Sequence, residues 1–151
     1  MKNVKELKIA LASDHAGYEL KNKVINYLQK TLGIAQIKDF GAFSAESSDY
    51  PDYAHPMAAA VESGAYDLGI SCCGSGNGIN ITANRHKGVR SALCWLPEIA
   101  ALARQHNNAN VLALPARFVS EQQALEIVEV FLNTNFEGGR HQKRIDKIEL
   151  E

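Results

Sequence analysis

The sequence predicts a doubly wound α/β fold, in which a five-stranded parallel sheet carries helices on both faces in a Rossmann-like arrangement. Short apolar runs with the length of strands alternate with helical patterns at intervals of about 25 to 30 residues, the spacing of β–α units in a parallel sheet. Several of these runs end in polar or glycine-rich turns, where sheets of this kind bind their ligands.

The apolar runs place the five strands. The first helix is predicted by Leu20, Val24 and Leu28, which recur on one helical face before Gly33, a plausible stop. A polar, turn-rich segment separates the second strand from the second helix. The candidate strands are residues 7–12, 34–40, 66–72, 89–95 and 111–114.

Prolines mark the starts of two further helices. Pro51 suits the first turn of a helix that runs to residue 63, where a glycine follows. Pro97 and the acidic residue after it begin an alanine-rich helix that is expected to end at residue 104. Between these two helices, a short helix should follow the glycine-rich loop and run to about residue 85.

The last third of the chain contains one clear helix and a basic end. Ser120, with Gln123 three positions later, has the pattern of a capping box before an amphipathic helix. Two glycines then separate this helix from residues 140–151, a basic segment.

Length and composition favour one domain over residues 1–151. A chain of 151 residues with 46% hydrophobic residues can bury one substantial core. The net charge of −1 provides no overall field for nucleic acid or an acidic membrane. The start lacks the apolar core of a signal peptide, and no run reaches the roughly 18 apolar residues of a membrane span, so we expect a cytoplasmic protein.

The three cysteines indicate reduced thiols rather than disulfides or a metal centre. Their number is odd, Cys72 and Cys73 are adjacent, and together with Cys94 they have no usual zinc-ligand spacing. We therefore expect no metal.

Residues 69–84 contain the strongest candidate for a functional loop, because a strand pattern ends in three closely spaced glycines before a helical pattern. Gly74, Gly76 and Gly78 would let backbone N–H groups face a ligand, and a helix start adds donors, so the loop favours an anion. Cys73 stands at the front of the loop, where such surroundings favour a thiolate. The alternative is an inert buried cysteine on a tight turn.

Spacing excludes three familiar glycine-loop classes. A dinucleotide fingerprint requires a glycine where this chain has Ile79. A Walker loop requires a lysine after the glycines, and a cysteine phosphatase requires an arginine that closes the loop. Neither residue follows here.

Polar residues near other strand ends are further candidates. Asp14 and His15 follow the first strand, although Asp14 is equally suited to capping a helix. Arg117 follows the fifth strand. His106 precedes that strand and could instead complement the negative end of a helix.

Arg140 and Arg144 are four positions apart and would share one face of a helix. A basic surface face is the simplest interpretation, but two guanidinium groups on one face could also clamp a phosphate dianion. Taken together with the thiol, the histidines and the glycine loop, they match a small phosphorylated substrate.

Several short motifs form a set that is specific as a whole. They are residues 13–17, 49–51, 73–78, 104–107, 110–113, Arg117 and residues 136–144. This set resembles the ribose-5-phosphate isomerase B family, which is related to galactose-6-phosphate isomerase subunits, and the motifs follow the family's order from about residue 8 to residue 148.

The resemblance implies a homodimer with shared active sites, or a tetramer, that interconverts an aldose phosphate and its ketose through an enediolate, without metal or cofactor. Ribose 5-phosphate and ribulose 5-phosphate are the expected substrate pair in carbohydrate metabolism. An alternative substrate is a 6-phosphohexose, such as allose or galactose 6-phosphate. A different class of function would be non-catalytic binding of a sugar phosphate.

The resemblance also implies roles for individual residues. Cys73 would be the base that moves the proton between C1 and C2, and His106 would help to open the sugar ring. The arginines would hold the phosphate, and a C-terminal helix would bring the last two into the partner's site. The substrate-binding set is Asp14, His15, Gly74, Ser75, Gly76, Asn77, Gly78, Asn107, Arg117, Arg140 and Arg144.

Two local features bear on the roles that the resemblance assigns to these residues. Alternation along a strand would point the thiols of Cys72 and Cys73 in opposite directions, which makes Cys72 a core residue. Pro115 stands where the family commonly has glycine, and this bears on the direction in which Arg117 points.

Overall fold

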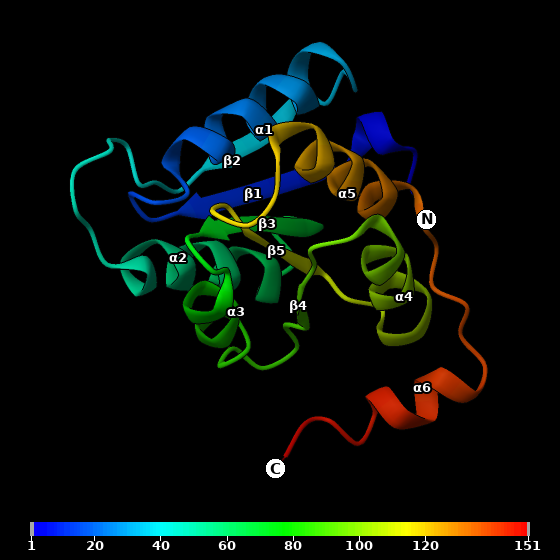
Figure 1. Ribbon diagram of the computed structural model, residues 1–151. Coiled ribbons are helices and arrows are strands. Elements are labelled where there is room, and N and C mark those ends of the chain that lie inside the picture. Colours follow the sequence, from blue (N-terminus) through cyan, green and yellow to red (C-terminus); the bar gives the residue numbers. More distant parts are fainter. Residues whose placement is uncertain (1, 151) are drawn as a thin grey trace.

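The computed structural model describes residues 2–150, and its centre is one parallel sheet with the strand order β2-β1-β3-β5-β4 (Figure 1). The fold is therefore the α/β class that the alternating pattern predicts. The strands are β1 (Lys8–Ser13), β2 (Gln36–Asp39), β3 (Leu68–Cys73), β4 (Ser91–Leu93) and β5 (Val111–Pro115).

Helices cover both faces of the sheet, with α1, α4 and α5 on one side and α2 and α3 on the other (Figure 1). Within residues 2–150 we find no helix with the length and apolar character to span a bilayer. The helices are the 3-10 turn η1 (Val4–Glu6), then α1 (Tyr18–Lys30), α2 (Tyr50–Glu62), α3 (Asn77–Ala83), α4 (Pro97–Asn107), α5 (Glu121–Asn133) and α6 (Arg140–Ile145).

The two faces of the sheet carry side chains of different size. In β1, Ile9 and Leu11 pack against the α1/α4/α5 layer, whereas Ala10 and Ala12 pack against α2. In β3, Gly69 leaves room for α2, because a Cβ there would lie 2.5 Å from the Met57 sulfur. Small residues thus let α2 approach the sheet closely, which fixes the start of α2 near the strand ends.

The end of α4 differs from the sequence prediction. The helix runs to Asn107 rather than ending at residue 104, so His106 and Asn107 lie in its last turn. Asn108 ends the helix in a left-handed conformation with φ 44°, which asparagine tolerates better than most residues, and its N–H bonds back to the helix.

Other predicted boundaries agree to within two residues, and a difference of two residues at each end makes the edge strand β4 only three residues long against a predicted seven. The predicted cap of α5 is confirmed, since the Ser120 hydroxyl accepts the Gln123 N–H at 3.1 Å. The reciprocal half of the capping box is absent: the Gln123 side chain donates instead to the Trp95 carbonyl at 2.7 Å.

The chain order makes the carboxyl ends of β1 and β3 the topological switch point of the sheet. From β1 the chain turns to β2 on one side, and it then crosses to β3 on the other side. Loops that leave neighbouring strands in opposite directions open a crevice between them, where doubly wound proteins bind their ligands.

Candidate active site

Cys73 is the last residue of β3, at the switch point. Its side chain belongs to the layer beneath α2 and α3, whereas that of Cys72 belongs to the opposite layer. Both residues are buried, Cys73 to 4% exposure and Cys72 completely. Burial raises the pKa of Cys72 to about 12, so that thiol stays protonated at neutral pH. The expectation that Cys72 is a core residue is confirmed.

The loop after Cys73 offers backbone donors. Among residues 2–150, no hydrogen bond uses the N–H groups of Gly74, Ser75 or Gly76. Gly76 has φ 77°, and a side chain there would collide with Leu93 and with the β5 backbone. The loop conformation therefore depends on glycine, and it leaves three N–H groups free to bind an anion.

Arg117 lies over this loop. Its N–H donates to the Gly74 carbonyl at 3.0 Å, and its Nη1 lies 3.1 Å from the point where a Cβ on Gly74 would be. Pro115 pairs with Cys73 as the last residue of β5, and the turn that follows it brings the arginine back to the loop. The structure thus brings together Cys73, the glycine loop and one of the three predicted arginines.

Asp14 and His15 enter the same crevice from β1. Ser13, the last residue of β1, pairs with Cys72, so Asp14 leaves the sheet next to the end of β3, where Cys73 lies. Asp14 is buried, and its Oδ1 accepts the Gly17 N–H at 3.1 Å; it therefore fixes the turn before α1 rather than capping the helix itself.

The His15 ring is held by the loop before α2. The Ser48 N–H donates to Nδ1 at 3.1 Å, and the His15 N–H donates to the Ser48 hydroxyl at 3.1 Å. Nδ1 also lies 3.2 Å from the Ser48 carbonyl, so Ser48 occupies this nitrogen in either neutral tautomer, and Nε2 is left for a ligand.

Tyr50 is a site residue that the sequence reasoning did not assign. Its ring covers the loop, because a Cβ on Gly78 would lie 2.5 Å from the ring. The residue is 37% exposed at the start of α2. Tyr50 is the middle residue of the family motif at residues 49–51, and that motif was the only signal that could have found it.

His106 and Asn107 lie toward the amino ends of the strands, on the side of the sheet opposite the crevice. Near the end of α4, Arg104 and Asn108 line a cavity with Leu68, the first residue of β3. The six residues of β3 place its amino end about 16 Å from Cys73 along the strand. Within one chain, His106 is therefore remote from Cys73.

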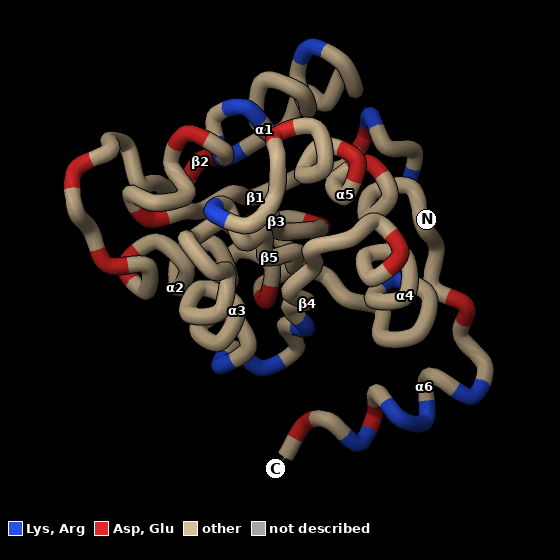
Figure 2. Tube along the Cα trace, viewed as in Figure 1, with Lys and Arg blue, Asp and Glu red and all other residues tan. Residues whose placement is uncertain are grey.

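The C-terminal arginines lie on the same side as His106 and Asn107, away from the crevice. Arg140 and Arg144 are exposed on α6, which packs near α4 and extends away from the sheet (Figure 1). Basic residues gather along α6, whereas the segment after it carries both acidic and basic residues (Figure 2). The predicted site residues thus form two groups, one at the carboxyl ends of the strands and one toward their amino ends.

Fold and site together define a doubly wound α/β protein with a cysteine and an anion-binding loop at its switch point. The profile of the ribose/galactose isomerase family matches residues 9–148. The chain belongs to this family, which confirms the resemblance seen in the motifs and the expectation of an aldose–ketose isomerase.

Individual relatives agree along nearly the whole chain. Ribose-5-phosphate isomerase B of Escherichia coli is 44% identical over 141 residues, 93% of each chain. A ribose 5-phosphate isomerase structure from Thermotoga maritima is 52% identical with a TM-score of 0.90, covering 94% of this chain and 97% of that one. The Mycoplasma genitalium enzyme with bound ribulose-5-phosphate is 48% identical with a TM-score of 0.88, covering 93% of each chain.

Proposed function

We propose that this protein interconverts ribose 5-phosphate and ribulose 5-phosphate, with residues 1–151 acting as one catalytic domain in the cytoplasm. The observation that carries the proposal is the meeting of Cys73, Asp14, the free N–H groups of the loop and Arg117 at one crevice. A relative of 48% identity is described with bound ribulose-5-phosphate, which supports this substrate pair.

Cys73 is the base in the proposed reaction. As a thiolate it takes the proton from C2 of the open-chain aldose, and the electron pair moves to the C1 oxygen to give an enediolate. The N–H groups of Gly74, Ser75 and Gly76 are the donors for that oxygen. The thiol then returns the proton to C1, while the proton of the C2 hydroxyl passes to the C1 oxygen, so that C2 becomes the ketose carbonyl and C1 carries the hydroxyl.

Side-chain donors complete the proposed site. The Ser75 hydroxyl accepts the Asn77 N–H at 3.2 Å, so its own proton is free for a substrate oxygen. Asp14 and His15 Nε2 face substrate hydroxyl or phosphate groups. Arg117 holds the phosphate, which orients a small and flexible sugar.

We propose that a second copy of the chain completes each site in a homodimer. His106 is needed to open the ring by giving a proton to the ring oxygen, yet in its own chain it lies toward the amino ends of the strands, whereas Cys73 ends β3, a strand about 16 Å long. The exposed Arg140 and Arg144 on the projecting α6 can reach a partner. The partner would therefore supply His106, Asn107 and both arginines, and a tetramer would arise from pairing of such dimers.

The activity is tested with purified protein, chelator and ribose 5-phosphate in deuterated water. We expect ribulose 5-phosphate with deuterium at C1, and deuterium at C2 of the aldose after reversal. Parallel reactions with allose 6-phosphate and galactose 6-phosphate distinguish a pentose phosphate substrate from a hexose phosphate substrate. Binding of all three sugars without turnover would overturn the proposal in favour of a sugar-phosphate-binding protein.

Shared sites are tested by mixing two inactive variants. Cys73→Ser and His106→Asn subunits, mixed in equal amounts and allowed to exchange, should recover about a quarter of the wild-type sites, because half the dimers are mixed and each has one intact site. No recovery, with subunit exchange verified by mass, would mean that both residues act within one chain.

A further inference from the structure

Glu137, His106 and His141 form a cluster at the junction of α4 and α6, outside the crevice around Cys73. His106 Nε2 lies 4.0 Å from Glu137 Oε1, and His141 Nε2 lies 3.4 Å from the same oxygen. The three residues can each offer one ligand atom within 4.8 Å of the other two. The two imidazole rings are stacked, with centroids 4.3 Å apart and planes inclined by 13°.

His141 contributes a buried nitrogen that lacks a hydrogen-bond partner among residues 2–150. Its side chain is 8% exposed, and its Nε2 makes no hydrogen bond within residues 2–150 because the geometry toward Glu137 does not satisfy one. Buried polar nitrogens are normally paired, so this one requires an explanation. The nitrogen lies beside the Glu137 carboxylate, and the His141 ring stacks on His106, so the three side chains could share one ligand.

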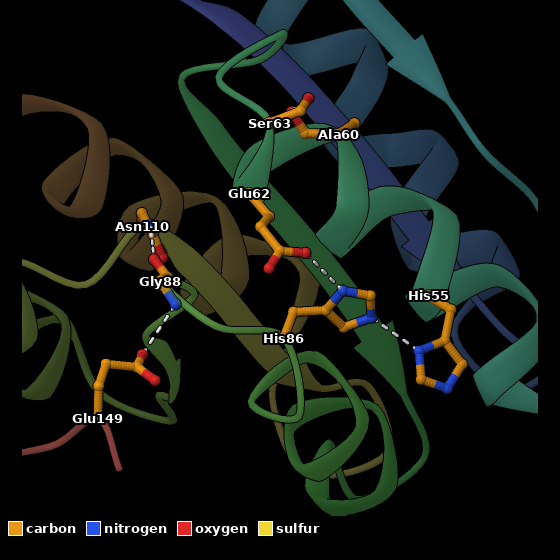
Figure 3. A network of polar contacts seen from close by, with 8 residues as sticks. All are labelled: His55, Ala60, Glu62, Ser63, His86, Gly88, Asn110 and Glu149. Atoms are coloured by element: carbon orange, nitrogen blue, oxygen red, sulfur yellow. Dashed lines mark hydrogen bonds and ion pairs between the residues drawn. The ribbon is translucent and has the colours of Figure 1, made fainter. Parts of the chain in front are cut away.

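A second histidine cluster in the same chain provides a contrast (Figure 3). There, His86 Nδ1 lies 3.1 Å from a Glu62 carboxylate oxygen, and His86 Nε2 lies 2.8 Å from His55 Nδ1. Both nitrogens of His86 are used. That cluster satisfies itself with hydrogen bonds, whereas the cluster at Glu137 does not.

We propose that Glu137, His106 and His141 bind a divalent transition metal ion, of which Zn²⁺ fits best, and that this ion inhibits the enzyme. Two imidazoles and one carboxylate, with water in the fourth position, are a common ligand set for tetrahedral zinc. Ligand atoms around zinc are about 3.3 Å apart. The distances of 3.4 and 4.0 Å approach this value. Magnesium and calcium prefer oxygen ligands and fit poorly.

Binding requires a small rearrangement. The stacked rings must tilt so that both lone pairs point at one ion, and His106, 39% exposed in the last turn of α4, is free to turn. Arg140, Lys143 and Arg144 on α6 repel a cation and weaken the site. We therefore infer a reversible inhibitory ion rather than a resident one.

The inhibition rests on the proposed function, but metal binding does not. An ion on His106 Nε2 occupies the nitrogen that would protonate the ring oxygen of the sugar. Binding should therefore slow turnover of the cyclic substrate, and a chelator should restore it.

The direct test is titration of chelator-treated protein with Co²⁺, followed by its visible absorption, and with Zn²⁺, followed by calorimetry. We expect one site per chain. Glu137→Gln and His141→Gln should each weaken binding by at least about 10-fold. The matched control His86→Gln, which alters the self-satisfied cluster, should bind as the wild type does.

Activity is measured in parallel. Zn²⁺ should inhibit the wild type reversibly, and Glu137→Gln should resist it without losing basal turnover. Because zinc also binds thiolates, Cys73→Ser protein is titrated too and should keep the site. Zinc binding that survives both Glu137→Gln and His141→Gln but disappears in Cys73→Ser would overturn the proposal. If no isomerase activity is found, the binding titrations still decide the metal site.

Discussion

Exchanging each of the adjacent cysteines for serine in turn tests the chemistry at the end of β3. Cys72 and Cys73 differ by one position, yet their side chains lie on opposite faces of the sheet. Both substitutions replace sulfur with oxygen and change volume little. Any difference between them therefore reports which face of the strand carries the reaction.

The two substitutions should affect different quantities, the turnover rate in one variant and the stability in the other. A positioned base contributes about 10²- to 10⁴-fold to the rate, so Cys73→Ser should lower kcat by that factor, which corresponds to about 3 to 5.5 kcal/mol of activation free energy. Cys72→Ser places a hydroxyl in a fully buried apolar cluster and should lower the free energy of unfolding by about 1–3 kcal/mol. Its turnover should stay near that of the wild type.

The assay combines initial rates, a binding isotherm for ribose 5-phosphate and urea unfolding. Cys73→Ser should bind the sugar with little change in Kd, because the phosphate and hydroxyl contacts come from other residues. If Cys72→Ser loses turnover while Cys73→Ser retains it, the thiol facing α1 and α5 is the base, and the assignment of the site to the α2/α3 side is wrong.

Two further predictions concern the loop and the α1/α5 contact. Gly76→Ala should lower the free energy of unfolding by about 1–3 kcal/mol more than Gly88→Ala, because both glycines have positive φ but only Gly76 lacks space for a side chain, next to Leu93; equal losses in urea unfolding would contradict this. Burial and the 2.6 Å hydrogen bond to Glu129 raise the pKa of Tyr27 to about 12. The neutral phenol is thus stabilised by folding, so this contribution is complete below about pH 10 and disappears as the pH rises to about 12. Tyr27→Phe should therefore flatten the fall in stability over that interval, and an unchanged slope would refute the assignment.

The local sequence predicted most of the secondary structure, because apolar spacing and turn residues act over short distances. Alternation alone assigned Cys72 to the core, and Ser120 caps α5 as its position indicates. The end of α4 was misjudged, because the residues His106 to Asn108 have the composition of a loop. Asn108 ends the helix only because its backbone adopts the left-handed conformation, and residue identity does not dictate that choice.

Tyr50 was missed for a related reason. Its ring covers Gly78 because the small residues on one face of the sheet let α2 pack close to it. Such a contact joins segments that are distant along the chain, and it depends on the volumes of side chains in several elements at once.

By itself, the sequence determined the α/β class, the family, and the nature of the chemical groups: a thiol at a strand end, a glycine loop and arginines suited to phosphate. Only the tertiary structure decided which groups meet. The order of strands brings Asp14, Cys73 and Arg117 to one crevice, and it leaves His106 beside Glu137 and His141 at the other edge. Residue types and spacing specify what a segment can do, whereas neighbours across the sheet are set by how all the elements pack together.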